Sequence, residues 1–208
     1  MGRASELVSR RLVLKDSVSP DDIEKLVVSL NWELEGYVKR DVDRQVDFSA
    51  TWRVDEVTRV YFVEDDYVDE RYFFVSGVEW SEIERVLDEI QSSIAVWTLD
   101  ELILECDGNI YPAGKGKAVV RLGVGAPLEA VDSVKDRIVG ASKHREPRVR
   151  RRALRAISYT PWPEYRERLA ELADGDLDEG VAREARVVLQ ALVDGAGSIP
   201  RPVNPNRL

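Results

Sequence analysis

The sequence predicts an α+β protein, in which a mixed N-terminal domain with an antiparallel β-meander and two or three helices precedes a short all-α module of helical repeats. Alternating apolar and polar side chains through residues 48–54 indicate a half-buried strand. From residue 128 onward, apolar side chains recur at helical spacing. Within that helical part, four residues return 32 positions later: Val149, Arg151, Ala153 and Ile157 recur as Val181, Arg183, Ala185 and Leu189. Such a repeat is typical of stacked helical hairpins, which serve mostly as binding surfaces.

The N-terminal segment predicts a strand followed by a helix. Residues 6–15 alternate loosely between apolar and polar side chains, which favours a strand. The run Ser19-Pro20-Asp21-Asp22 supplies an N-cap, a proline in the first turn and two acids beside the helix N-terminus. Apolar residues then follow helical spacing, so the sequence predicts a helix that ends near Trp32.

The next segment predicts the meander. Residues 60–63 and 72–75 are short runs rich in β-branched and aromatic side chains, and with 48–54 they predict three successive strands. Acidic turns separate the three strands, so antiparallel neighbours are expected. Helical spacing resumes from Trp80 to Ile90.

Residues 94–113 leave two alternatives open. Thr98 and Glu101 have the spacing of a capping box at the start of a short helix, whereas residues 101–105 also fit a strand. Residues 118–122 predict a strand, and the glycines and proline of 123–127 indicate a boundary. The expected organisation is an acidic α+β domain at 1–126, a helical module at 127–194 and an extended, mobile tail at 195–208.

The helical module resembles HEAT-like repeats. Residues 146–157 begin with an acid-Pro-x-Val-Arg opening, as the second helix of such a repeat does, and residues 177–185 are similar. The second copy departs from the pattern at two positions. Gly180 is near the position where the pattern has proline, and Ala182 occupies the position of its first arginine. The resemblance covers residues 127–194, and it implies two stacked helix pairs of a kind found in scaffolds, adaptors and a few enzymes.

Composition indicates a water-soluble globular protein. Hydrophobic residues make up 44% of the chain and charged residues 33%, with a net charge of −9. Residues 1–130 contain 15 Lys+Arg and 27 Asp+Glu, and residues 131–208 contain 15 and 12, so the charge is unevenly divided. No apolar run predicts a membrane span, and basic residues interrupt the N-terminus where a signal peptide would be apolar. The single cysteine cannot form an internal disulfide, so the expected location is the cytoplasm. The leading interpretation is a bacterial-type protein.

The residue inventory argues against several kinds of catalytic site. His144 is the single histidine and Cys106 the single cysteine, so the usual zinc ligand sets cannot form and a cysteine–histidine pair has no local motif behind it. Residues 114–117 resemble a fragment of a phosphate loop, but they lack its spacing and precede an expected strand, which favours a hairpin turn. We therefore expect no catalytic residues, no metal and no cofactor.

An acidic cluster is the first candidate binding site. Its carboxylates repel one another, which favours a basic protein surface or a hard cation nearby, although a solvated turn between strands is the more ordinary explanation of the pattern. The cluster lacks the glycine-centred pattern of a calcium-binding loop. Its members are Glu64, Asp65, Asp66, Asp69 and Glu70.

A basic helical face is the second candidate. Four arginines recur at spacings of three, one and three, which places them on one side of a helix: Arg148, Arg151, Arg152 and Arg155. Guanidinium groups bind carboxylates and phosphates well, so a protein partner, a nucleic acid and purely internal ion pairs all remain open.

These observations favour a non-enzymatic protein–protein interaction protein, either an adaptor or an inhibitor of the immunity-protein type. Its acidic cluster and its arginine face would contact another protein. The alternative is a nucleic-acid-associated protein, or a base-modifying enzyme that uses the arginine face. The net charge of −9 weighs against that alternative.

Overall fold

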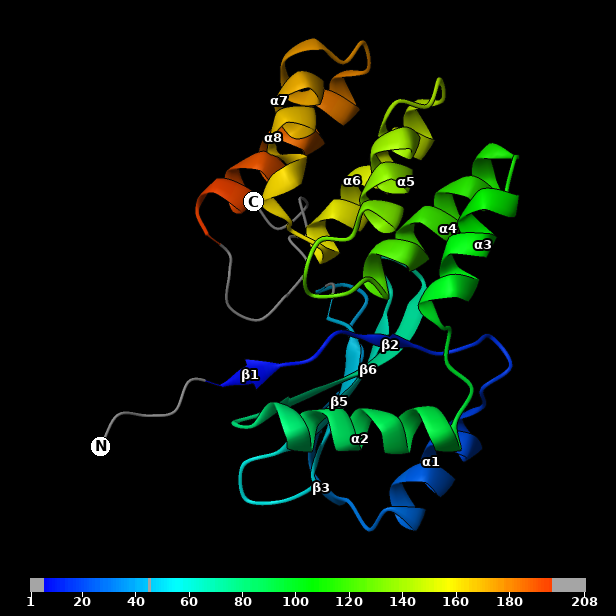
Figure 1. Ribbon diagram of the computed structural model, residues 1–208, viewed down its shortest axis with the longest axis vertical. Coiled ribbons are helices and arrows are strands. Elements are labelled where there is room, and N and C mark those ends of the chain that lie inside the picture. Colours follow the sequence, from blue (N-terminus) through cyan, green and yellow to red (C-terminus); the bar gives the residue numbers. More distant parts are fainter. Residues whose placement is uncertain (1–5, 45, 196–208) are drawn as a thin grey trace. The chain divides into compact units, whose positions relative to one another are not determined.

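The computed structural model describes residues 6–44 and 46–195, and it confirms the α+β fold class. The chain divides into two compact units, Met1–Trp97 and Thr98–Leu208. A mixed sheet-and-helix unit thus precedes an all-helical one (Figure 1). The expected tail falls outside the described residues from 196 onward. Within the described part, no helix is both long and apolar enough to cross a membrane.

The first unit is built on an antiparallel sheet in the order β1-β6-β5-β4-β3, with β2 also paired to β6. The expected meander is present as β4, β5 and β6, which pair in sequence order. The strand expected at residues 6–15 is present as two short strands along β6. The strands are β1 (Leu7–Val8), β2 (Leu12–Val13), β3 (Glu33–Val38), β4 (Phe48–Arg53), β5 (Arg59–Asp65) and β6 (Glu70–Gly77).

Two helices, α1 (Pro20–Ser29) and α2 (Trp80–Ser93), cover one face of this sheet. Ser19 caps α1, as the sequence predicts, and it does so through a reciprocal pair of hydrogen bonds with Asp22. Ile23 of α1 and Ile83 of α2 are buried in the same core as Phe73 of β6. The helices therefore bury their apolar stripes against the apolar side of the strands.

The second unit consists of helical hairpins. Within residues 98–195, α3 packs on α4, α5 on α6 and α7 on α8, so three hairpins stand side by side (Figure 1). The second helices of the hairpins contact one another in turn, α4 against α6 and α6 against α8. The helices are α3 (Leu99–Gly108), α4 (Pro112–Val124), α5 (Asp132–Ser142), α6 (Pro147–Tyr159), the 3₁₀ turn η1 (Pro163–Tyr165), α7 (Arg166–Gly175) and α8 (Glu179–Val193).

The hairpin α3–α4 corrects the prediction for this region. Residues 118–122 lie in α4 rather than in a strand, and residues 114–117 lie in the same helix rather than in a hairpin turn. Every residue from Ala118 to Val124 is buried, Arg121 included, so this run lacks the one-sided spacing of an amphipathic helix. The unit boundary accordingly falls between Trp97 and Thr98, well before the expected position at residue 126. Of the alternatives at 94–113, the helix capped by Thr98 and Glu101 is the one formed.

Two glycines of α4 bring that helix close to α6. Gly116 and Gly123 are seven residues apart, so they share one helical face. A Cβ atom at Gly123 would lie 2.6 Å from the Cα of Ala156, and one at Gly116 would lie 3.0 Å from Cγ of Arg152. Gly123 therefore permits a contact between the two helices that a larger side chain would prevent, whereas at Gly116 the neighbour is a side chain that can shift.

Candidate functional site

The acidic cluster lies at the turn between β5 and β6, and it is not the surface patch expected from the sequence. Asp65 ends β5, Glu70 begins β6, and the two residues pair across the strands. Only 3% of Asp65 and 4% of Glu70 is exposed. The prediction of a five-carboxylate binding surface is therefore wrong for these two residues, because the β5–β6 register extends over them and buries their side chains.

Asp65 has a structural role in this turn. Its carboxylate accepts hydrogen bonds from the backbone N–H of Tyr67 at 3.1 Å and from the hydroxyl of Tyr72 at 3.1 Å. Burial and the nearby charge of Asp65 raise the pKa of Tyr72 well above its ordinary value, so Tyr72 remains a hydrogen-bond donor. Asp69 completes the turn with a left-handed backbone, at φ 60°.

The remaining acids of the cluster do not form a common surface either. Asp66 is exposed, and its carboxylate is paired with Arg40 at 2.6 Å. Glu64 is half-buried in β5, and Asp69 is exposed in the turn. The cluster therefore combines structural carboxylates with a few solvated ones, and a basic partner would meet only part of the predicted charge.

The arginine face of α6 divides into anchored and exposed side chains. Nε of Arg151 lies 2.6 Å from Oε2 of Glu184 on α8, and Arg155 approaches the same buried carboxylate at 3.9 Å. Arg152 packs over Gly116 of α4. Arg148 is exposed and, within the described residues, has no ion pair. Three of the four predicted residues thus hold neighbouring hairpins together.

One arginine of α6 that is not in the predicted set is anchored more firmly than the arginines of that set. Arg150 donates two hydrogen bonds to the carboxylate of Asp176, at 2.7 and 2.6 Å, and it also donates to the carbonyl of His144. These bonds raise the pKa of Arg150 above its ordinary value. Burial alone would raise the pKa of Asp176, but the bonds from Arg150 and from the backbone of Asp178 outweigh it and lower that pKa.

Further exposed cations lie on α8, where the sequence interpretation did not place them. Arg183 and Arg186 are both exposed and, among the residues that the structure describes, neither forms an ion pair. Their spacing of three puts them on adjacent positions of the polar side of α8. The 32-residue repeat could have indicated Arg183, since it is the counterpart of Arg151. Together with Arg148, these residues form the exposed arginine set (Arg148, Arg183 and Arg186).

His144 and Cys106 show no catalytic arrangement. His144 lies at the turn before α6, where Nδ1 accepts the backbone N–H of Glu146 at 3.0 Å. Cys106 is fully buried in α3, and burial is the main reason that its thiol pKa is raised. Over residues 6–44 and 46–195, no group of three or more His, Cys, Asp or Glu side chains is placed to hold a metal ion.

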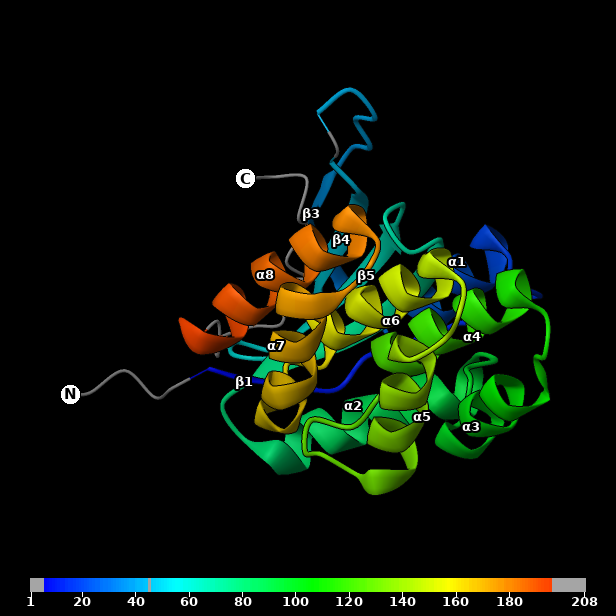
Figure 2. The same ribbon diagram turned by 90° about the horizontal axis from the view of Figure 1, so that it is seen from above.

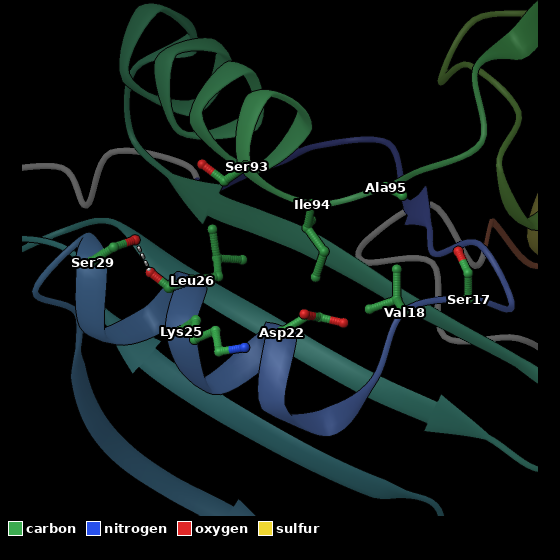
Figure 3. Close-up of a pocket in the computed structure, with 9 residues that line it drawn as sticks. All are labelled: Ser17, Val18, Asp22, Lys25, Leu26, Ser29, Ser93, Ile94 and Ala95. Carbon is green, nitrogen blue, oxygen red and sulfur yellow. Dashed lines mark hydrogen bonds between the residues drawn. The ribbon is translucent and has the colours of Figure 1, made fainter.

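A shallow hollow of about 410 Å³ lies in the first unit, between α1 and the end of α2 (Figure 3). Two of its polar groups have partners within α1: the carboxylate of Asp22 accepts from the backbone N–H of Ser19, and the hydroxyl of Ser29 donates to the carbonyl of Leu26 at 2.8 Å. These two groups therefore hold the helix together. Its lining residues are Ser17, Val18, Asp22, Lys25, Leu26, Ser29, Ser93, Ile94 and Ala95.

The fold and its surfaces define a protein with an antiparallel sheet unit and a unit of stacked helical hairpins. Comparison with protein-family models, with curated proteins and with solved structures finds no match to this chain. The resemblance of residues 127–194 to HEAT-like repeats thus remains an inference from sequence. Its structural counterpart is the arrangement of hairpins α5–α6 and α7–α8.

Proposed function

We propose that this protein is a non-enzymatic interaction protein whose helical unit binds an acidic segment of a partner protein. The observation that supports the proposal most strongly is that some arginines of α6 and α8 form internal ion pairs and others do not. Arg150 and Arg151 are held by internal carboxylates, whereas the exposed arginine set has no ion pair among the described residues. Exposed guanidinium groups on packed helices are preorganised for carboxylate ligands.

The charge of the two units favours a short acidic segment over a nucleic acid. The first unit contains 12 Lys+Arg and 22 Asp+Glu, a formal charge of −10, whereas the second contains 18 and 17, a formal charge of +1. A duplex carries about one negative charge per 1.7 Å and is repelled by an acidic unit on the same chain. A short acidic peptide needs to contact only the helical unit, so it avoids most of that repulsion.

This function can be tested by fluorescence anisotropy with three labelled probes: a glutamate-rich peptide, a single-stranded RNA and a double-stranded DNA of similar charge. The variant R148E/R183E/R186E reverses the exposed arginine set. We expect it to weaken peptide binding by roughly tenfold or more, a loss of about 1.4 kcal/mol or more. The effect should shrink as salt is added, because the contacts are exposed.

A matched control reverses three cations elsewhere on the helical unit, in K143E/R145E/R166E. These three residues are also exposed, so the control changes the net charge equally. It should leave peptide binding near the wild-type level. Equal losses in both variants, or no peptide binding by the wild-type protein at low salt, would overturn the proposal. Tighter binding of either nucleic acid, with a steep salt dependence that the triple variant loses, would instead establish the nucleic-acid alternative.

A further inference from the structure

Among the residues that the structure describes, one long strand of the sheet in the first unit has an open edge. β3 is the last strand in the order, it pairs there with β4 alone, and all six of its residues are exposed. Residues 39–44, which follow β3, project from the sheet (Figure 2). An open edge of this length presents unpaired backbone N–H and C=O groups that can pair with another strand.

Three of the six side chains of β3 are large, apolar and exposed. Tyr37 is 57% exposed, and Leu34, Val38 and Val42 are also large exposed apolar residues on the strand or just beyond it. A β-bulge interrupts the β3–β4 register between Leu34 and Gly36, which is one way in which edges are blunted. The segment from Gly36 to Val38 beyond the bulge pairs regularly with β4, so its outer edge is regular as well.

The charges along the strand are complementary to those of a second copy. Glu33 and Glu35 lie in its N-terminal half, and Lys39 and Arg40 follow its C-terminal end. Antiparallel pairing of two such strands about Gly36 and Tyr37 places the acidic half of each copy opposite the basic end of the other. A parallel arrangement would set like charges together, which is destabilising.

The ion pairs within one copy are compatible with this arrangement. Glu33 bonds to Arg53 of β4, Glu35 pairs with Arg59 of β5 at 2.7 Å, and Arg40 pairs with Asp66. These pairs hold the carboxylates over one face of the sheet, and Glu33 and Arg40 remain exposed. The formal charge of −10 on the whole unit opposes association at long range, but it is screened beyond about 10 Å at moderate salt.

We propose that β3 is a self-association edge, through which two copies of this chain pair antiparallel and join their sheets into one. The dimer is two-fold symmetric, since each copy uses the same strand. It is independent of the arginine-mediated function above, because it involves only residues of the first unit.

Sedimentation velocity measures the association directly. At micromolar concentration, the apparent mass of the wild-type protein should be twice the 23.6 kDa of one chain. The variants E33K/E35K and K39E/R40E should each be monomeric. The edge of E33K/E35K is wholly basic and that of K39E/R40E is wholly acidic, so two copies of the same variant repel each other. An equimolar mixture of the two should again form dimers, since the basic edge of one variant then meets the acidic edge of the other. Far-UV circular dichroism of each variant confirms that it is folded.

Two outcomes of that experiment would overturn the proposal. The first is a monomeric wild-type protein at all accessible concentrations, and the second is a mixture of the two variants that stays monomeric. The control E84K/D88K changes exposed residues of α2 by the same charge and should stay dimeric. If this control is also monomeric, net charge rather than the edge governs association, and the assignment to β3 fails.

Disulfide trapping tests the position of the contact. In an antiparallel pair centred on Tyr37, the two Y37C side chains lie directly opposite each other, with their Cβ atoms about 4.5–5.5 Å apart. If the pair is centred between Gly36 and Tyr37, each Y37C lies opposite Gly36 of the other copy, next to its Y37C. Y37C should therefore form disulfide-linked dimers under mild oxidation, whereas V28C, at an exposed position on α1, should not. Cys106 is fully buried and does not compete. Equal cross-linking at both positions would contradict the proposed edge.

Discussion

Gly123 decides how closely α4 approaches α6, because its missing side chain leaves room for the backbone of Ala156. Three atoms of Ala156, two of them backbone atoms, lie within 2.8 Å of the place where a Cβ atom would stand. Backbone atoms cannot rotate away, so a methyl group there must push the two helices apart. The loss of unfolding free energy on replacing Gly123 by alanine therefore measures how tightly the hairpins α3–α4 and α5–α6 are packed together.

We predict that G123A lowers the free energy of unfolding by about 1–3 kcal/mol, as overpacking of a tight contact does. The helix propensity gained by replacing glycine, about 1 kcal/mol, is smaller than this strain. Urea unfolding followed by circular dichroism measures the change. The matched control is G140A in α5, where an added Cβ meets nothing within 4 Å. It should leave stability unchanged or raise it by up to about 1 kcal/mol. A G123A protein as stable as the G140A protein would show that the helices move apart without cost.

The acidic cluster shows which residue-level features a sequence can indicate. Five carboxylates within seven residues predicted a solvated or partner-binding turn, and the turn itself is present. The burial of Asp65 and Glu70 follows from the strand register and from Tyr72, which donates to Asp65 from the neighbouring strand. That partner depends on pairing between strands, which charge patterning along the chain does not encode.

At the scale of elements, the ion pair of Arg150 and Asp176 ties α6 to the turn before α8. The side chain of Arg150 is 12% exposed and that of Asp176 is 4% exposed, so the pair is largely shielded from water. Removing one partner would leave the other charge buried without compensation, which costs far more than breaking an exposed pair. The pair therefore fixes the second hairpin against the third.

We predict that D176N lowers the free energy of unfolding at neutral pH by about 3 kcal/mol. The double variant R150M/D176N should lose less than the sum of the two single variants, because each single change disables the same pair. Thermal and urea denaturation measure both effects. The control D132N breaks an exposed pair with Lys135 and should cause no measurable change. Additive losses in the double variant would show that the two residues act separately.

The same pair predicts a pH dependence of known sign. The pKa of Asp176 in the folded protein is below the ordinary value of 3.8. The unfolded chain therefore binds a proton at higher pH than the folded chain does. The stability from this carboxylate is fully present above about pH 5 and is lost as the pH falls through the folded pKa. In D176N, unfolding should depend less on pH over that acidic range.

The elements differ in how far the sequence could predict them. The start of α1 was predicted and that of α3 was one of two alternatives, because capping signals are local: Ser19 with Asp22 and Thr98 with Glu101 are three residues apart. β3 was missed because its segment contains acids and a glycine and is exposed throughout, so its strand conformation depends on pairing with β4. α4 was taken for a strand because packing buries it on all sides and hides its helical period.

At the scale of the whole chain, the helical unit contains one more hairpin than the sequence repeat indicates. The 32-residue repeat in the sequence indicated two hairpins, fewer than the three or so that such a module usually needs to be stable. The structure supplies the hairpin α3–α4 in front of them. A weak counterpart of the repeat exists there, since Pro112 and Ala118 stand 35 residues before Pro147 and Ala153. The changed spacing and the buried surface of α4 concealed it.

The third hairpin leads to a prediction about isolated fragments. Residues 98–208 should give a helical circular dichroism spectrum and one cooperative melting transition, because they contain every helix of the second unit. Residues 127–208, which start at the boundary expected from sequence, should lack a cooperative transition. They lose α4, against which α6 makes its most extensive helix contact, and so they expose buried side chains such as Ala156. A G123A version of the longer fragment provides the control, since it should melt cooperatively but at a lower temperature. If the two fragments melt with equal cooperativity and midpoint, the hairpin α3–α4 is dispensable and the unit begins where the sequence first suggested.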